Sequence, residues 1–150
     1  MGIYRGKRNM LLNQWAETGF SGSREGLTPQ QHKLLRTIVY SQLIFRAHHG
    51  CCIGADLIFH NIVKEEGIRV VAHPPINPSK RAHCIADEVR FPLPYLDRNK
   101  ELVNESDILI ACPNSKDENI RSGTWQTIRY AKLIHRPILI ILPAGEIHLL

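Results

Sequence analysis

Residues 121–131 of the chain read Arg-Ser-Gly-Thr-Trp-Gln-Thr-Ile-Arg-Tyr-Ala, and they stand between two apolar runs at residues 108–112 and 138–142. The order of these segments predicts a strand, a glycine loop, a helix and a second strand. Strands that alternate with helices are typical of α/β domains with a parallel sheet. This stretch therefore decides the fold class, and the remaining strands have to come from the residues before it.

The four residues that begin this stretch also have the chemistry of a phosphate site. Ser122 and Thr124 are favourable helix caps, and Gly123 lets the backbone approach a ligand closely. The first turn of a helix carries unpaired N–H groups and a partial positive charge, which favour a bound phosphate. Arg121 adds a planar set of donors that suits phosphate oxygens. The simpler alternative, that Ser-Gly-Thr only caps the helix, is equally compatible with this stretch alone.

Earlier apolar runs predict three more strands, each followed by a helix. The strands are expected at residues 15–20, within 47–56 and at 68–72, and the helices at 28–46, 55–65 and 95–103. Apolar runs without polar alternation indicate a parallel sheet that is covered on both faces. We therefore expect an α/β fold, a single Rossmann-like three-layer sandwich with a mostly parallel sheet of about five strands. Residues 15–150 form this domain, and residues 1–14 form an N-terminal arm.

The composition fits one ordinary globular domain. The 150 residues are 43% hydrophobic and 22% charged, and no apolar run approaches the roughly 20 residues of a membrane-spanning helix. The N-terminus lacks the apolar centre of a signal peptide, so we expect a cytoplasmic protein with reduced cysteines and no membrane partner. A net charge of +5 favours polyanionic ligands, from a nucleotide to a nucleic acid. Residues 146–150 are apolar enough to pack on another subunit, so we expect a homo-oligomer.

A second possible phosphate loop follows the first predicted strand. It contains two hydroxyls, a glycine and an arginine in a row: Ser21, Gly22, Ser23 and Arg24. Small residues permit close approach of a ligand, and consecutive N–H groups can form an anion-binding nest. The alternative is a plain connection from strand to helix, which needs glycine in any case.

Polar residues also stand at the starts of two other predicted helices. Gly54 precedes Asp56, whose carboxylate can accept ribose hydroxyls as in other nucleotide-binding folds, or can simply complement the helix dipole. Tyr95, Arg98 and Asn99 share one helix face, where they can stack on a base, bind a phosphate and read a hydroxyl. The alternative for these three is a solvated face with one packing tyrosine.

Two adjacent pairs, His48-His49 and Cys51-Cys52, invite a zinc interpretation. Tetrahedral zinc sites usually take their ligands from separated pairs such as C-x-x-C. We therefore expect these histidines to form local hydrogen bonds, and we predict neither a metal nor a cofactor.

The loops that follow the predicted strands carry most of the residues named above. In open parallel sheets, ligands bind beyond the carboxyl ends of the strands. The loops are residues 21–24, 52–56, 73–75 and 113–124. Because they converge on one edge of the sheet, a ligand site there is favoured over the separate structural alternatives.

Four blocks of the sequence, taken in order, resemble the SLOG superfamily. They read GFSGSR at residues 19–24, TPxQ at 28–31, HHGxCxGAD at 48–56 and RSGTWxTIR at 121–129. The most similar branch is the YspA/YpsA-related one, which consists of small Rossmannoid nucleotide-binding proteins of bacteria and phages. The similarity covers about residues 15–143, and each block alone is a weak signal.

The resemblance implies more than one activity. The superfamily includes the "lonely guy" phosphoribohydrolases, which cut nucleoside monophosphates at the N-glycosidic bond. It also includes DNA-processing proteins such as DprA, and domains that sense ADP-ribose-derived signals. The hydrolase pattern PGGxGTxxE matches at Gly123 and Thr124, but Thr127 stands where its glutamate belongs. Glycosidic cleavage needs a carboxylate, so Asp56 or Glu25 would have to substitute.

The sequence as a whole favours a binding module, with no catalytic residue identified. We expect the protein to bind, and so to sense or sequester, a nucleotide or an ADP-ribose-derived small molecule through its glycine-rich loops. One alternative is an N-glycoside or nucleotide phosphoribohydrolase with a relocated carboxylate. Another is a nucleic-acid-binding protein that uses its basic N-terminus. The latter is less favoured because the aromatic residues form no evident stacking stripe.

Overall fold

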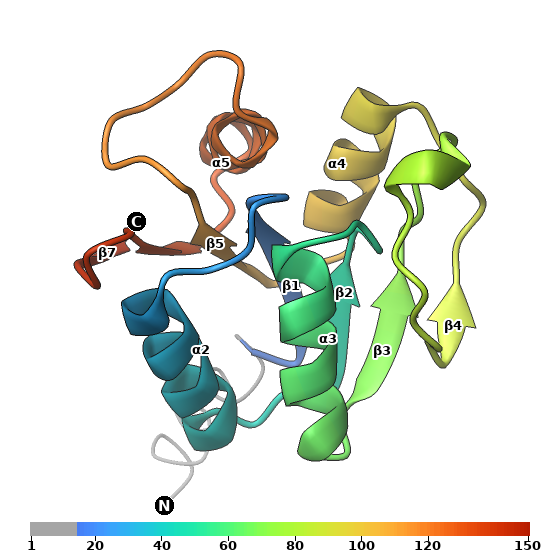
Figure 1. The fold of residues 1–150 in the computed structure, drawn as a ribbon, viewed down its shortest axis with the longest axis horizontal. Helices are drawn as coiled ribbons and strands as arrows, with labels where there is room; N and C mark the ends of the chain where they lie inside the picture. Colours follow the sequence, from blue (N-terminus) through green and yellow to red (C-terminus); the bar gives the residue numbers. More distant parts are fainter. Residues whose placement is uncertain (1–14) are drawn as a thin grey trace, which may run out of the picture.

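The computed structural model describes residues 15–150, so the arm expected at residues 1–14 lies outside the described residues. A seven-stranded sheet runs through this part of the chain (Figure 1), in the order β4-β3-β2-β1-β5-β6-β7. Its strands are β1 (Glu17–Gly22), β2 (Arg46–His49), β3 (Arg69–Ala72), β4 (Glu88–Val89), β5 (Ile108–Cys112), β6 (Ile138–Ile141) and β7 (Ile147–Leu149). Neighbouring strands pair in parallel, except that β7 pairs antiparallel with β6.

Helices cover both faces of the sheet. They are α2 (Pro29–Ser41), α3 (Ala55–Glu65), α4 (Tyr95–Asn104) and α5 (Gly123–Leu133), with a short 3-10 helix, η1 (Pro78–Lys80), after β3. α2 and α3 lie on one face, and α4 and α5 lie on the other (Figure 1). The predicted three-layer α/β class is therefore confirmed. No helix among residues 15–150 is long and apolar enough to cross a membrane.

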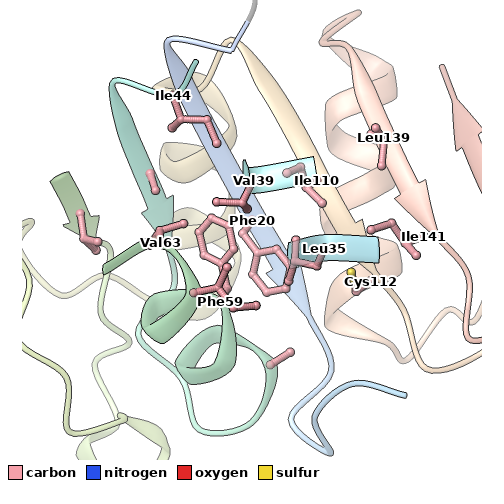
Figure 2. Close-up of a cluster of buried hydrophobic side chains, with 14 residues drawn as sticks. Phe20, Leu35, Val39, Ile44, Phe59, Val63, Ile110, Cys112, Leu139 and Ile141 are labelled. Atoms are coloured by element: carbon pink, nitrogen blue, oxygen red, sulfur yellow. The ribbon is translucent and has the colours of Figure 1, made fainter. Parts of the chain in front are cut away.

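The face under α2 and α3 holds a hydrophobic cluster (Figure 2). Phe20 of β1 and Phe59 of α3 stack with ring centroids 4.5 Å apart, and Leu35 of α2 packs in the same cluster. Side chains alternate between the two faces along a strand. Ile110 of β5 therefore belongs to this cluster, whereas its neighbour Leu109 lies on the opposite face and packs in a second cluster with Trp125 of α5. Both faces of the central strands are thus buried, which explains why their sequences are apolar without alternation.

The sheet has two strands more than the five that the sequence predicts, and one helix ends earlier than predicted. β4 has only two residues at the sheet edge, and β7 has three residues after the turn at Gly145, so neither is long enough to give a readable pattern. Through β7, residues 146–150 pair with β6 within the chain. α2 ends at Ser41 rather than near residue 46, because Gln42 takes an extended conformation with ψ of 151°.

The start of α2 is tied to the ends of β5 and β6. Thr28 and Gln31 form the expected capping box, with each side chain accepting the other residue's N–H at 3.1 Å. The Gln31 side-chain amide also donates to the carbonyls of Pro113 and Ile141, at 2.8 and 2.9 Å. These bonds fix the point at which the chain leaves β5 toward α5.

The strand order reverses at β1. From β1 the chain moves outward to β2, β3 and β4, and it then returns to β5 on the other side of β1. The loop after β1 leads to α2 on one face, whereas the loop after β5 leads to α5 on the opposite face. Such a switch point leaves a crevice at the carboxyl ends of the two strands, where open α/β sheets bind ligands.

Candidate functional site

Two adjoining pockets lie at this switch point, beyond the carboxyl ends of β1 and β5. The larger pocket is open to solvent, has a volume of about 330 Å³, and is lined by the loops after β1 and β5 and by the start of α5. The smaller pocket has a volume of about 20 Å³ and lies between β1, α3 and α4. Gly22, Arg24 and Tyr95 line both pockets, so the two share a wall.

Hydrogen-bond donors gather in the larger pocket at the start of α5. Ser122 caps the helix, because its side chain accepts a backbone N–H of the first turn at 3.3 Å. The backbone N–H groups of Gly123 and Thr124 belong to the first turn of α5. They have no hydrogen-bond partner within the helix, because no helical carbonyl lies four residues before them. Arg24 and Arg121 are both exposed and line the same pocket. The larger pocket thus combines two cations with a helix N-terminus, which is the chemistry that binds phosphate.

Tyr95 reaches from α4 across to the start of α5. A Cβ atom at residue 123 would overlap the Tyr95 hydroxyl, so Gly123 is required for this close approach. The centroid of the Tyr95 ring lies 5.7 Å from Cζ of Arg24 and 4.9 Å from Cζ of Arg98. These cation–π contacts hold the wall between the two pockets in position.

The smaller pocket contains an unsatisfied hydrogen-bond donor. Asn99 is 8% exposed, and within the described residues its Nδ2 has no hydrogen-bond partner, while its Oδ1 accepts from Nε of Arg98 at 2.9 Å. A buried donor without a partner costs about 1–3 kcal/mol. The pocket volume of about 20 Å³ suits one water-sized group. A ligand hydroxyl of that size would satisfy the Asn99 donor.

Asp56 lies in the same small pocket and is almost fully buried. Burial raises its pKa to about 6, against the opposing effects of Arg98 and of the backbone N–H groups of Cys52 and Gly50. Its Oδ2 accepts the N–H of Cys52 at 3.1 Å. Near neutral pH this side chain therefore changes between a carboxylate, which only accepts, and a carboxylic acid, which also donates.

The sequence predicts a phosphate contact for Arg98, but its guanidinium forms hydrogen bonds with backbone carbonyls inside the protein. It is 4% exposed, and its Nη1 donates to the carbonyls of Gly50 and His73 at 2.5 and 3.2 Å. A Cβ at residue 50 would overlap the guanidinium, so glycine makes room for it. Arg98 thereby fastens α4 to the ends of β2 and β3, and it forms part of the wall of the smaller pocket.

Gly54 lines neither pocket, unlike the other residues that the sequence predicts for the site. It caps α3 with a φ of 92°, and a Cβ there would overlap the backbone of Arg24. The carbonyl of Ser23 accepts the N–H of Ala55 at 2.9 Å in the same place. Gly54 therefore lets α3 pack on the loop of residues 21–24 and hold its shape.

The remaining predicted residues come together in the two pockets. Those of the smaller pocket are Ser21, Gly22, Arg24, Asp56, Tyr95, Arg98 and Asn99. Those of the larger pocket are Gly22, Ser23, Arg24, Tyr95, Arg121, Ser122, Gly123 and Thr124. The sequence analysis did not predict seven further lining residues, namely Phe20, Gly50, Cys52, Leu102 and Thr127 in the smaller pocket and Asn114 and Asn119 in the larger one.

Asn119 is the missed residue for which a sequence signal existed. Its Oδ1 accepts the N–H of Arg121 at 2.9 Å, and its carbonyl accepts the N–H of Ser122 at 3.2 Å. An asparagine two residues before an Arg-Ser cap is typical of a turn in which the side chain bonds the backbone. Asn119 therefore shapes the loop that presents Arg121 to the larger pocket.

No protein-family model matches the chain, and no curated protein matches its sequence. Several solved structures do share the fold. A molybdenum cofactor binding protein from the phototrophic bacterium Rippkaea orientalis is 21% identical with a TM-score of 0.64, over 83% of this chain and 75% of that one. TM1055, a structural genomics target, is 17% identical with a TM-score of 0.58, over 81% of this chain and 71% of that one. DNA processing protein A (DprA) from Streptococcus pneumoniae is 18% identical with a TM-score of 0.59, over 86% of this chain and 51% of that one.

Identities this low establish the fold alone. The three neighbours share the three-layer α/β fold that the resemblance of the four sequence blocks implies. The described part of the chain therefore has a Rossmann-like three-layer fold that it shares with these structures.

Proposed function

We propose that the protein binds a nucleotide-type small molecule, with its phosphate at the start of α5 and a sugar hydroxyl in the smaller pocket. The observation that carries the proposal is the wall of Gly22, Arg24 and Tyr95 that the two pockets share. Because the two pockets adjoin at these three residues, one ligand can reach both the anion site and the unsatisfied donor of Asn99.

Charge and size support a phosphate in the larger pocket. Arg24 and Arg121 come from different loops and flank the first amides of α5. Of the residues that line this pocket in the described structure, only Glu25 is acidic. The volume of about 330 Å³ is at the lower end of the range for small-molecule sites, which favours a mononucleotide-sized ligand.

The chemistry of the smaller pocket supports the hydroxyl. Nδ2 of Asn99 would donate to the hydroxyl oxygen, and the carboxylate of Asp56 would accept its proton in a hydrogen bond. A pocket of about 20 Å³ cannot admit a sugar ring or a base. The ring and base therefore stay in the larger pocket or at its rim, beside Tyr95.

Hydrolysis of an N-glycosidic bond is the second candidate function, and Asp56 is the observation that favours it. A carboxyl group whose pKa is raised to about 6 is suited to general acid–base catalysis near neutral pH. Thr127, which stands at the position of the hydrolase glutamate, donates its hydroxyl to the Gly123 carbonyl at 2.9 Å and offers no carboxylate. Asp56, or Glu25 at the larger pocket, would have to supply this function.

Isothermal titration calorimetry with matched ligand pairs tests the proposal. A nucleoside monophosphate should bind roughly 100-fold more tightly than its nucleoside, since each hydrogen bond to a charged group contributes about 1.5–3 kcal/mol. Equal affinities of the two ligands would contradict a phosphate site at the start of α5. Chromatography of the same mixtures for free base separates binding from hydrolysis.

Native mass spectrometry of protein taken directly from cells identifies the ligand class without a panel. Two structural neighbours are a molybdenum cofactor binding protein and a DNA processing protein, so that cofactor and single-stranded DNA belong in the titration series beside nucleotides. A co-purified mass that corresponds to a phosphate-containing small molecule is expected. Tight binding of DNA alone would favour the nucleic-acid alternative instead.

A further inference from the structure

Two buried histidines meet beneath β2 and β3, on the side of the sheet that α4 covers. Nδ1 of His48 lies 2.9 Å from Nε2 of His73, and neither residue is exposed to solvent. The outer nitrogen of each ring faces a carboxylate. Nδ1 of His73 lies 2.7 Å from Glu101, and Nε2 of His48 lies 3.5 Å from Glu17. The result is an unbroken chain of carboxylate, imidazole, imidazole and carboxylate.

With both rings neutral, this chain of hydrogen bonds cannot be completed. A carboxylate only accepts hydrogen bonds, so the outer nitrogen of His73 must carry a proton for Glu101, and its inner nitrogen is then a bare acceptor. If His48 donates its inner proton to His73, its outer nitrogen has none to offer Glu17. If His48 keeps its outer proton instead, two lone pairs face each other across 2.9 Å. An added positive charge satisfies every contact, either as a second proton on His48 or as a metal ion bound between the two rings.

The surrounding charges show the same deficit. Four carboxylates line the network, but within the described residues only two guanidinium groups form ion pairs with them: Glu17, Glu88, Glu101 and Glu105 against Arg46 and Arg90. With both imidazoles neutral, these four carboxylates and two guanidinium groups have a net charge of −2, which a divalent cation would balance.

We propose that a divalent transition-metal ion of the zinc class binds here, with His48, His73 and Glu105 as its protein ligands. One ligand atom from each of these residues lies within 4.8 Å of those of the other two. Oε1 of Glu105 accepts from Nη2 of Arg90 at 2.8 Å, and its Oε2 accepts from Nε of Arg90 at 3.3 Å and lies 4.0 Å from Nδ1 of His73. Imidazole nitrogens and a carboxylate oxygen form a donor set typical of zinc.

Glu17 and Glu101 then become the outer partners of the metal-bound imidazoles. Metal-ligating histidines almost always donate their other ring N–H to a carboxylate, a carbonyl or water, and both rings here already face a carboxylate. The side chains of Glu101 and Glu105 are 29% and 31% exposed, which gives the ion a route from solvent. The ion would join α4 to β2 and β3.

A second group of possible ligands, His49, His60 and Cys84, does not lack a cation. Nδ1 of His49 accepts the N–H of Cys51 at 2.9 Å, so the proton of this ring is on Nε2. That proton is donated to Nδ1 of His60 at 3.0 Å. The hydrogen bonds of His49 are therefore complete without an ion, although the three ligand atoms of this group also lie within 4.8 Å of one another.

Cobalt and zinc titrations of the chelator-treated protein distinguish the two groups. We expect one equivalent of Zn²⁺ by elemental analysis, and a Co²⁺ spectrum with d–d bands but no thiolate-to-cobalt charge-transfer band. This measurement needs no variant, so it does not depend on a mutant that folds. A thiolate band, or no stoichiometric binding of either ion, would overturn the proposal.

Three variants then locate the ion. His73→Gln should weaken Zn²⁺ binding by more than about 100-fold, and Glu101→Gln by about 10–100-fold, as for other outer-shell carboxylates. Cys84→Ser, the matched control in the second group, should bind Zn²⁺ as the parent does. Loss of binding in Cys84→Ser with retention in His73→Gln would assign the ion to the other cluster and refute ours.

Discussion

The two pockets share a wall, but the polar side chains proposed to bind the ligand differ in burial between them. In the larger pocket, the side chains of Arg24 and Arg121 are exposed to solvent. In the smaller pocket, Asp56 and Asn99 are buried, and their hydrogen bonds are part of the fold. The difference teaches that the first pair can be changed with little effect on stability, whereas changes to the second pair alter stability and ligand binding together.

The largest effect should come from the residue on which both pockets depend. Gly123→Val places a side chain where the Tyr95 hydroxyl lies and so displaces the shared wall. We expect nucleotide affinity, measured by calorimetry, to fall by more than about 100-fold, because the anion site and the route to Asn99 are lost together.

A matched control for this change is available at the other end of the sheet. Gly67 follows α3 with a φ of 70° and has open space around it, so Gly67→Asn tolerates the same conformation without touching either pocket. It should bind nucleotides as the parent does. Unchanged affinity in Gly123→Val would show that the two pockets do not act as one ligand site.

The next effect concerns the exposed cations of the larger pocket. Arg24→Ala and Arg121→Ala should each weaken phosphate-bearing ligands by about 10–100-fold, since a hydrogen bond to a charged group contributes about 1.5–3 kcal/mol. The melting temperature should hardly change. Arg36→Ala, which removes an equally charged and exposed residue from α2, should leave binding intact. A large loss of stability in the first two variants would show that these arginines belong to the fold instead.

The pH dependence of stability should report on Asp56. Its pKa is raised from 3.8 to about 6 in the folded protein, so the native state binds the proton more tightly than the unfolded chain does. Stability from this group is therefore greatest below pH 4 and declines as the pH rises toward about 6. The decline should amount to about 1–3 kcal/mol.

Chemical denaturation of Asp56→Asn and of the parent at several pH values measures this contribution. The variant should show a smaller decline between pH 4 and 6.5, while Asp97→Asn, a change at an exposed position of α4, should follow the parent. Parallel curves for Asp56→Asn and the parent would show that Asp56 is not desolvated, and the contrast between the pockets would be weaker.

The smallest effect should be the most selective one. Asn99→Ala removes the unsatisfied donor, so we expect about 2–10-fold weaker binding of ligands that bear the sugar hydroxyl. Affinity for the deoxy analogue should be unchanged. Equal losses for both ligands would place the hydroxyl elsewhere. The same pair of ligands applies to Asp56→Asn, which should also discriminate against the hydroxyl form.

Local signals in the sequence account for much of the fold. The Thr28 and Gln31 capping box, the apolar run of β5 and the Gly-rich start of α5 each determine structure through neighbouring residues, and each lies where the sequence predicts. β4 and β7 could not be predicted in this way. They are short edge strands whose formation depends on the neighbouring strand rather than on their own pattern.

The candidate site was predictable as a set of loops but not as a set of contacts. The helical period places Arg98 and Asn99 on one face of α4, and both line the smaller pocket. It gives no sign that the carbonyls of Gly50 and His73 accept hydrogen bonds from the arginine. Likewise, His48 and His73 are 25 residues apart, and only the pairing of β2 with β3 brings them together. Contacts between distant segments are set by topology, which the sequence pattern specifies only indirectly.

A crystal structure of the protein with a bound nucleoside monophosphate would test the central claim most directly. The account predicts that the phosphate lies against the amides of Gly123 and Thr124, with Arg24 and Arg121 beside it. A sugar hydroxyl should lie within hydrogen-bond distance of Nδ2 of Asn99. A nucleotide bound away from the start of α5, or one whose phosphate is there while the small pocket holds only water, would contradict the claim that the two pockets form one site.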